Sequence, residues 1–91
     1  MAVYVDPLVN YGGSKSFRWK ESCHMFADTE EELHEMARKI GMKRDWFQQQ
    51  RTEFPHYDLV ESRRIRAVKL GAVELTLRQM VEYVKARRAN V

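Results

Sequence analysis

The sequence lacks the features that mark secreted, membrane-spanning and disulfide-stabilised proteins. Cys23 is the single cysteine among 91 residues, so no internal disulfide forms, and a reducing compartment fits best. No apolar run approaches the roughly 18–20 residues needed to span a bilayer. No basic segment followed by an apolar one opens the chain, as a signal peptide requires. We therefore expect a cytoplasmic protein that does not associate with membranes.

An excess of charge of one sign is also missing. The sequence holds 16 Lys and Arg residues against 13 Asp and Glu residues, which gives a net charge of +3. This balance permits a small anionic ligand but does not favour a nucleic-acid partner, which calls for a strongly basic surface. The content of 44% hydrophobic and 32% charged residues is that of a globular protein. The length fits one domain, residues 1–91.

Short apolar runs alternate with segments of helical periodicity. Residues 2–5, 22–27 and 72–75 are apolar on both faces, which predicts buried strands. Helices are predicted at about residues 28–40, 60–70 and 76–89. This order predicts an α/β fold, a small three-layer sandwich with a mainly parallel sheet of about three strands and helices on both faces.

Capping signals mark the ends of the predicted helices. Asp28 and Thr29 each stand three residues before a Glu, the spacing of a capping box, so Asp28 is interpreted first as a helix cap. Gly41 fits the left-handed position that ends a helix, and the second helix is predicted to stop at Gly71. Thr76 stands three residues before a Gln and is predicted to cap the last helix.

The segment Phe54–Leu59 is the strongest candidate for a functional site. It is predicted as a loop that combines a proline, an imidazole, aromatic rings and a carboxylate, and functional groups concentrate on such loops. His56 and Asp58 are candidate catalytic residues. His24 is a third candidate, because imidazole titrates near neutrality. Its place inside an apolar strand fits a hydrogen-bonded core histidine equally well.

Arg64 is predicted to point along the apolar face of its helix. At 100° per residue it shares that face with Ala67 and Val68. A buried guanidinium needs a carboxylate, carbonyl or phosphate partner. An ion pair with one of the nearby aspartates and a contact with a ligand both meet this need, so a structural and a functional role stay open.

The expected sheet gathers polar groups at its carboxyl-terminal edge, where ligands of open parallel sheets bind. The candidate ligand-binding residues are Asp6, Arg18, Trp46, Tyr57 and Arg64. Histidine with aspartate is a donor set that suits a divalent ion, but the spacings HxH, HxxxH, HExxH and CxxC do not occur. No metal ligands are therefore predicted, and no cofactor is identified.

Several short blocks of the sequence resemble one small family. The blocks are Val3–Leu8, Cys23–Asp28, Lys43–Gln48, Pro55–Leu59, Ser62–Arg64 and Leu70–Glu74. Together they resemble a bacterial and phage family classed as a domain of unknown function, whose members read roughly VYVDP, CHLxAD, KRxWFQ and PHYDL. The resemblance covers about residues 3–75 and leaves the last helix, 76–89, outside it. It implies that the His and Asp blocks form one module, and it implies no activity.

Three functions fit these observations, and whether the protein is an enzyme stays open. The first is binding of a small phosphorylated or nucleotide-like anion by Arg64, His56 and Arg18. The second is a small hydrolase or phosphodiesterase, in which His24 or His56 acts as general acid/base and Asp6 or Asp58 orients the histidine or binds a metal ion. The third is an interaction module, such as a phage protein that binds a host factor, with a purely structural polar cluster. A small sheet leaves edges that a homo-oligomer would cover.

Overall fold

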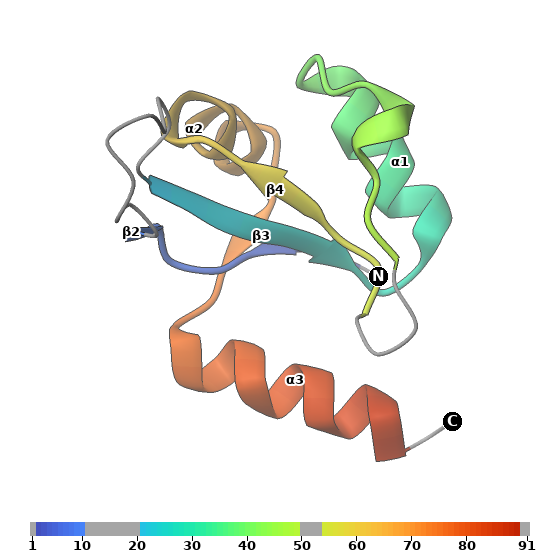
Figure 1. The fold of residues 1–91 in the computed structure, drawn as a ribbon, viewed down its shortest axis with the longest axis vertical. Helices are drawn as coiled ribbons and strands as arrows, with labels where there is room; N and C mark the ends of the chain where they lie inside the picture. Colours follow the sequence, from blue (N-terminus) through green and yellow to red (C-terminus); the bar gives the residue numbers. More distant parts are fainter. Residues whose placement is uncertain (1, 11–20, 50–53, 90–91) are drawn as a thin grey trace.

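A computed structural model describes residues 2–10, 21–49 and 54–89 of the chain. A sheet crosses the middle of the molecule, with β4, β3, β1 and β5 in that spatial order and β2 paired to the start of β3 (Figure 1). The strands are β1 (Val3–Val5), β2 (Val9–Asn10), β3 (Glu21–Ala27), β4 (Tyr57–Leu59) and β5 (Val73–Glu74). The helices are α1 (Glu30–Lys39), the 3-10 turn η1 (Arg44–Trp46), α2 (Glu61–Lys69) and α3 (Leu77–Ala89).

The sheet is mixed, so the prediction of a mainly parallel sheet is wrong. β3 runs antiparallel to β1, β2 and β4, and β1 with β5 is the parallel pair in the described part of the chain. The apolar composition of the strands reports burial on both faces but not strand direction, which explains the error. The α/β class itself is confirmed.

The predicted strands and helices are present, and two short strands, β2 and β4, were not predicted. The strands expected at 2–5, 22–27 and 72–75 and the three helices are all present. The segment at 54–59 instead contains β4, whose side chains alternate between buried and exposed. Tyr57 and Leu59 are buried while Asp58 is exposed, the period of two that a half-buried strand requires.

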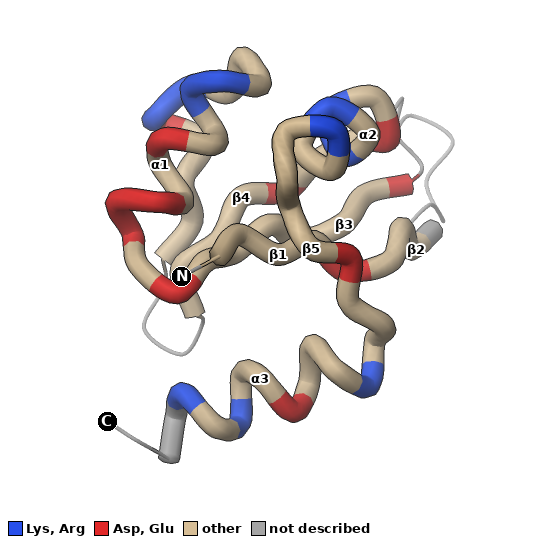
Figure 2. Tube along the Cα trace, turned by 180° about the vertical axis from the view of Figure 1, so that it is seen from behind, with Lys and Arg blue, Asp and Glu red and all other residues tan. Residues whose placement is uncertain are grey.

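Thr29, and not Asp28, caps α1. The Thr29 hydroxyl accepts a hydrogen bond from the Glu32 backbone N–H at 3.2 Å. Figure 2 shows acidic residues along the start of α1 and basic residues at its end, which suits the helix dipole. Gly41 follows with a φ of 82°, where a side chain would be strained. The predicted cap of α3 is confirmed, because Thr76 accepts from the Gln79 N–H at 3.1 Å.

The two faces of the sheet differ in what they carry. The core face bears alternate residues such as Val5, Met25 and Leu59, which pack with Leu33 of α1 and Ala67 of α2 in the hydrophobic core. The outer face bears the residues in between, among them Tyr4, His24 and Phe26. In Figures 1 and 2, α1 and α2 lie on one side of the sheet and α3 lies on the other. None of the helices in the described part of the chain has the length and apolar content needed to cross a membrane.

Asp28 attaches α3 to the outer face. Its carboxylate accepts hydrogen bonds from the Tyr83 hydroxyl at 2.6 Å, the Tyr4 hydroxyl at 3.1 Å and the Ala2 backbone N–H at 2.8 Å. The Tyr83 ring lies 4.8 Å from the Tyr4 ring and 5.2 Å from the Phe26 ring. The hydrogen bond from Tyr83 is the main cause that lowers the pKa of Asp28. Burial, followed by this same bond, raises the pKa of Tyr83.

This contact predicts that the stability contributed by Tyr83 depends on pH. The pKa of Asp28 is lowered in the folded protein, so the ionised carboxylate stabilises the folded state. This stabilisation is complete above the ordinary carboxyl pKa, and it is lost as the pH falls through the lowered pKa. In Tyr83→Phe the free energy of unfolding in urea should fall by about 1–2 kcal/mol near neutral pH. The loss should shrink in acid, and Asp28→Asn should remove this pH dependence. An equal loss at neutral and acidic pH would contradict the assignment.

Candidate functional site

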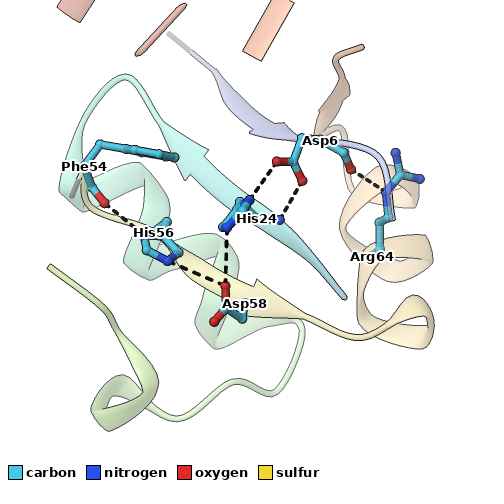
Figure 3. Close-up of polar contacts among 6 residues, drawn as sticks. All are labelled: Asp6, His24, Phe54, His56, Asp58 and Arg64. Atoms are coloured by element: carbon cyan, nitrogen blue, oxygen red, sulfur yellow. Dashed lines mark hydrogen bonds and ion pairs between the residues drawn. The ribbon is translucent and has the colours of Figure 1, made fainter. Parts of the chain in front are cut away.

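Strand pairing brings His24, His56 and Asp58 together on the outer face. The register of β3 and β4 sets His24 directly opposite Asp58. His56 precedes Asp58 by two residues, so both side chains leave β4 on the same side. Figure 3 shows the two imidazole rings turned toward the Asp58 carboxylate. We call these three residues the His–Asp cluster. It lies on the face of the sheet, since His24 is in the middle of β3.

The nitrogen atoms that face Asp58 are the Nε2 atoms of both histidines. Nε2 of His56 lies 3.5 Å from Asp58 Oδ1, and Nε2 of His24 lies 3.9 Å from the same oxygen. The two imidazole rings are 5.0 Å apart and meet edge to face. These separations exceed a direct hydrogen bond. The three groups therefore surround a common point without being bonded to one another.

The other ring nitrogen of each histidine is held by a hydrogen-bond acceptor. Nδ1 of His24 lies 2.8 Å from Asp6 Oδ2, and the His24 backbone N–H donates to Asp6 Oδ1 at 2.6 Å. Nδ1 of His56 lies 2.9 Å from the Phe54 carbonyl oxygen. A carbonyl oxygen only accepts, and an ionised carboxylate only accepts, so both Nδ1 atoms carry hydrogen. In the neutral imidazoles the lone pairs are then on the Nε2 atoms that face Asp58.

Gln48 is a contributor that the sequence did not reveal. Its backbone forms a two-way antiparallel bridge with His56, at 2.9 and 3.0 Å. Its side-chain amide donates to Asp58 Oδ2 at 2.5 Å, which leaves Oδ1 turned toward the imidazoles. Nothing in a Gln-Gln-Gln run distinguishes the first glutamine from the others. Only the pairing of the segment before β4 identifies it.

Two hollows adjoin the His–Asp cluster. The first, of about 370 Å³, lies between the sheet and α3, and we call it the α3 hollow. It is lined by His24, Phe54, His56, Met80, Val81, Val84 and Lys85. The second, of about 600 Å³, is called the Trp46 hollow. It is lined by Met42, Asp45, Trp46, Gln48, Asp58, Val60, Ser62 and Arg63. The cluster thus contributes to the walls of both.

Arg64 lies outside the cluster and outside the lining of both hollows. Its Nε donates to the backbone carbonyl of Asp6 at 3.0 Å, and its Nη1 pairs with Glu74 at 3.0 Å. Its side chain is 16% exposed, which confirms that Arg64 faces inward on α2. Figure 3 shows it on the far side of Asp6 from Asp58. These contacts give Arg64 a structural role. Arg64 therefore does not share a pocket with His24 and His56.

The other candidate ligand-binding residues fall in different places. Asp6 is buried and reaches the cluster through His24. Trp46 is 44% exposed and lines the Trp46 hollow. Tyr57 is fully buried on the core face, where its hydroxyl lies 2.8 Å from His34 Nδ1, so it is turned away from the cluster. Burial raises the pKa of the Tyr57 hydroxyl. Arg18 lies outside the described residues.

Cys23 neighbours His24 but points to the core face. Burial is the main cause that raises the pKa of its thiol to about 12, and the Asp6 carboxylate adds to this effect. A thiol with so high a pKa carries almost no thiolate near neutral pH, and the thiolate is the reactive form. Cys23 is therefore an inert core residue and not a candidate nucleophile.

The contacts of Arg64 predict a large loss of stability when it is truncated. Arg64→Ala should lower the free energy of unfolding by about 2–3 kcal/mol, because the Asp6 carbonyl loses its donor and a mostly buried side chain is removed. Glu74→Gln serves as the control. It removes only the ion pair to an exposed carboxylate, so it should cost less than about 1 kcal/mol. Urea unfolding of both variants measures the difference, and equal losses would contradict the structural role.

A family model described as "Protein of unknown function (DUF4031)" matches residues 3–87. The resemblance to a domain of unknown function is thereby confirmed. The match extends past residue 75 and takes in most of α3, which the sequence blocks had left outside. No curated protein and no solved structure matches the chain.

Proposed function

The chain belongs to this family of unknown function, and we propose that it binds a small phosphorylated or nucleotide-like ligand on the outer face of its sheet. The observation that carries the proposal is the composition of the α3 hollow, which joins the two imidazoles of the His–Asp cluster to apolar side chains and a lysine. Ligand sites are typically concave, largely apolar and furnished with a few convergent polar groups.

Each part of such a ligand has a matching group in the α3 hollow. Met80, Val81 and Val84 provide an apolar wall on α3, against which a base or another ring would pack. Phe54 stands on the other side, with its ring 5.3 Å from that of His56. Lys85 and the histidines offer donors to phosphate oxygens. Lys85 thus takes the place that the sequence had suggested for Arg64.

The proposal predicts that phosphorylated ligands raise the melting temperature through Lys85. Inorganic phosphate, pyrophosphate and adenosine monophosphate are suitable probes for thermal shift measurements. A ligand at ten times its Kd stabilises the folded state by about 1.4 kcal/mol, which corresponds to roughly 5–10 °C for a domain of this size. Lys85→Ala should weaken binding about tenfold, through the loss of a charged donor.

Lys39→Ala is the matched control for this experiment. Lys39 is also an exposed lysine on a helix, but it lines neither hollow. Its substitution should leave the shift unchanged. If no probe shifts the melting temperature, or if both lysine variants lose the shift equally, the proposal is wrong and a structural role of the polar cluster gains support.

Hydrolysis of a phosphate ester is the second candidate function. The observation that favours it is the orientation of the imidazoles, whose Nδ1 atoms are anchored while both Nε2 atoms face the space beside Asp58. An anchored imidazole of this kind can transfer a proton at Nε2, and Asp6 would orient His24 as the carboxylate of a catalytic triad orients its histidine. In this function His24 and His56 are the proton-transfer groups.

Hydrolysis predicts turnover of an activated phosphate ester that depends on His56. With bis(p-nitrophenyl) phosphate as the probe, His56→Gln should reduce the rate by roughly 10²–10⁴-fold, measured as released p-nitrophenolate. His34→Gln is the control, since His34 bonds Tyr57 on the core face and not the cluster. Thermal unfolding of both variants shows whether they remain folded. Turnover that survives in folded His56→Gln would contradict a catalytic role for His56.

A further inference from the structure

We propose that His24, His56 and Asp58 bind a divalent transition-metal ion. The inference shares its site with the proposed function but does not depend on which organic ligand binds there. One donor atom from each of the three residues lies within 4.8 Å of the donor atoms of the other two. We assign as donors Nε2 of His24, Nε2 of His56 and Oδ1 of Asp58, because both Nε2 atoms face this oxygen.

The spacing of these atoms is close to that of a coordination sphere. Bonds of roughly 2.0–2.1 Å from zinc to nitrogen or oxygen place tetrahedral ligand atoms roughly 3.3 Å apart. The Asp58 oxygen lies 3.5 Å from one imidazole nitrogen and 3.9 Å from the other. The Asp58 side chain is 46% exposed, and its rotation together with a shift of the imidazole rings would bring all three atoms to metal-bonding distance.

The hydrogen bonds behind the histidines are those that metal ligands need. Metal-bound imidazoles almost always donate their second N–H to a carboxylate or a backbone carbonyl, which fixes the tautomer and the ring orientation. His24 has the Asp6 carboxylate in this position, at 2.8 Å, and His56 has the Phe54 carbonyl, at 2.9 Å. Gln48 similarly holds the oxygen of Asp58 that is not turned to the imidazoles. Every proposed ligand therefore has its own orienting partner.

A cation also removes an electrostatic conflict within the cluster. With both Nδ1 atoms protonated, each neutral imidazole presents a lone pair toward the Asp58 carboxylate oxygen. When the imidazoles are neutral, these lone pairs face the carboxylate oxygen at 3.5 and 3.9 Å and repel it, and either a proton on Nε2 or a bound cation relieves the repulsion. Asp6 and Asp58 also place two carboxylates next to the histidines that line the α3 hollow. A divalent ion accepts all three lone pairs and balances the two carboxylates.

The donor set selects the chemical class of the ion. Two imidazoles with one carboxylate suit zinc, cobalt, iron(II) and similar first-row ions, whereas magnesium and calcium prefer oxygen ligands alone. Three protein ligands leave at least one coordination position for water or for a ligand oxygen, as in catalytic zinc sites. Because His24 and His56 line the α3 hollow, an ion held by them would lie beside a phosphate bound there.

Zinc and cobalt(II) binding to the full chain tests the inference. Isothermal titration with Zn²⁺ should give one ion per chain, and Co²⁺ should give a visible absorption spectrum typical of nitrogen and oxygen ligands. Asp58→Asn is the main variant, because an exposed side chain can be changed without loss of the fold. It should weaken Zn²⁺ binding by more than about 100-fold, since even the loss of an outer-shell partner costs 10–100-fold. His56→Gln should act in the same direction.

His34→Gln is the control, because it removes a histidine outside the cluster and should keep the metal affinity. A folded wild-type chain that binds neither ion, or Zn²⁺ affinity that is unchanged in Asp58→Asn, would overturn the inference. The experiments distinguish failure of the metal site from failure of the phosphorylated ligand. Metal binding without any thermal shift by phosphorylated probes would support the metal site and contradict the proposed ligand. A full thermal shift by phosphorylated probes in the presence of EDTA, with no binding of Zn²⁺ or Co²⁺, would support the proposed ligand and contradict the metal site.

Discussion

The arrangement of the site depends on the hydrogen bonds of one buried residue, Asp6. Its N–H donates to the His24 carbonyl at 3.2 Å, and its carboxylate receives both the His24 backbone N–H and the ring Nδ1. Its own carbonyl receives Arg64 from α2. A buried carboxylate is tolerated only when its oxygens are satisfied in this way. Asp6 thereby fixes the orientation of His24 and joins the end of β1 to β3 and α2.

Much of the fold could be predicted from the sequence because its signals are local. The periodicity of α1, the Thr76 cap and the glycine that ends α1 each depend on residues within a few positions of one another. Strand direction is decided by pairing between distant segments, which apolar composition does not encode. β4 was missed for a related reason. The alternation of buried and exposed residues in β4 spans only Tyr57–Leu59 and closely follows a proline. The proline and the polar residues favoured a loop prediction over such a short strand pattern.

The composition of the site was predictable only in part. His24, His56 and Asp58 stood out by residue type, but their convergence follows from the register of β3 with β4. Arg64 was correctly expected to face inward, yet its partners are a backbone carbonyl and Glu74, and an inward direction alone does not distinguish these from a ligand. Gln48 and Lys85 carry no signal in the sequence, since an amide or an amine on a polar segment is ordinary.

The division of the His–Asp cluster between two strands has a mechanical consequence. β4 is three residues long, so its backbone ladder to β3 is short. A molecule or ion held by His24 on one side and by His56 and Asp58 on the other ties the two strands together as a cross-link does. Its binding free energy then adds to the free energy required to separate β4 from β3. Occupancy of the site would therefore slow hydrogen exchange at the β4 amides, because the same binding free energy opposes the opening of β4.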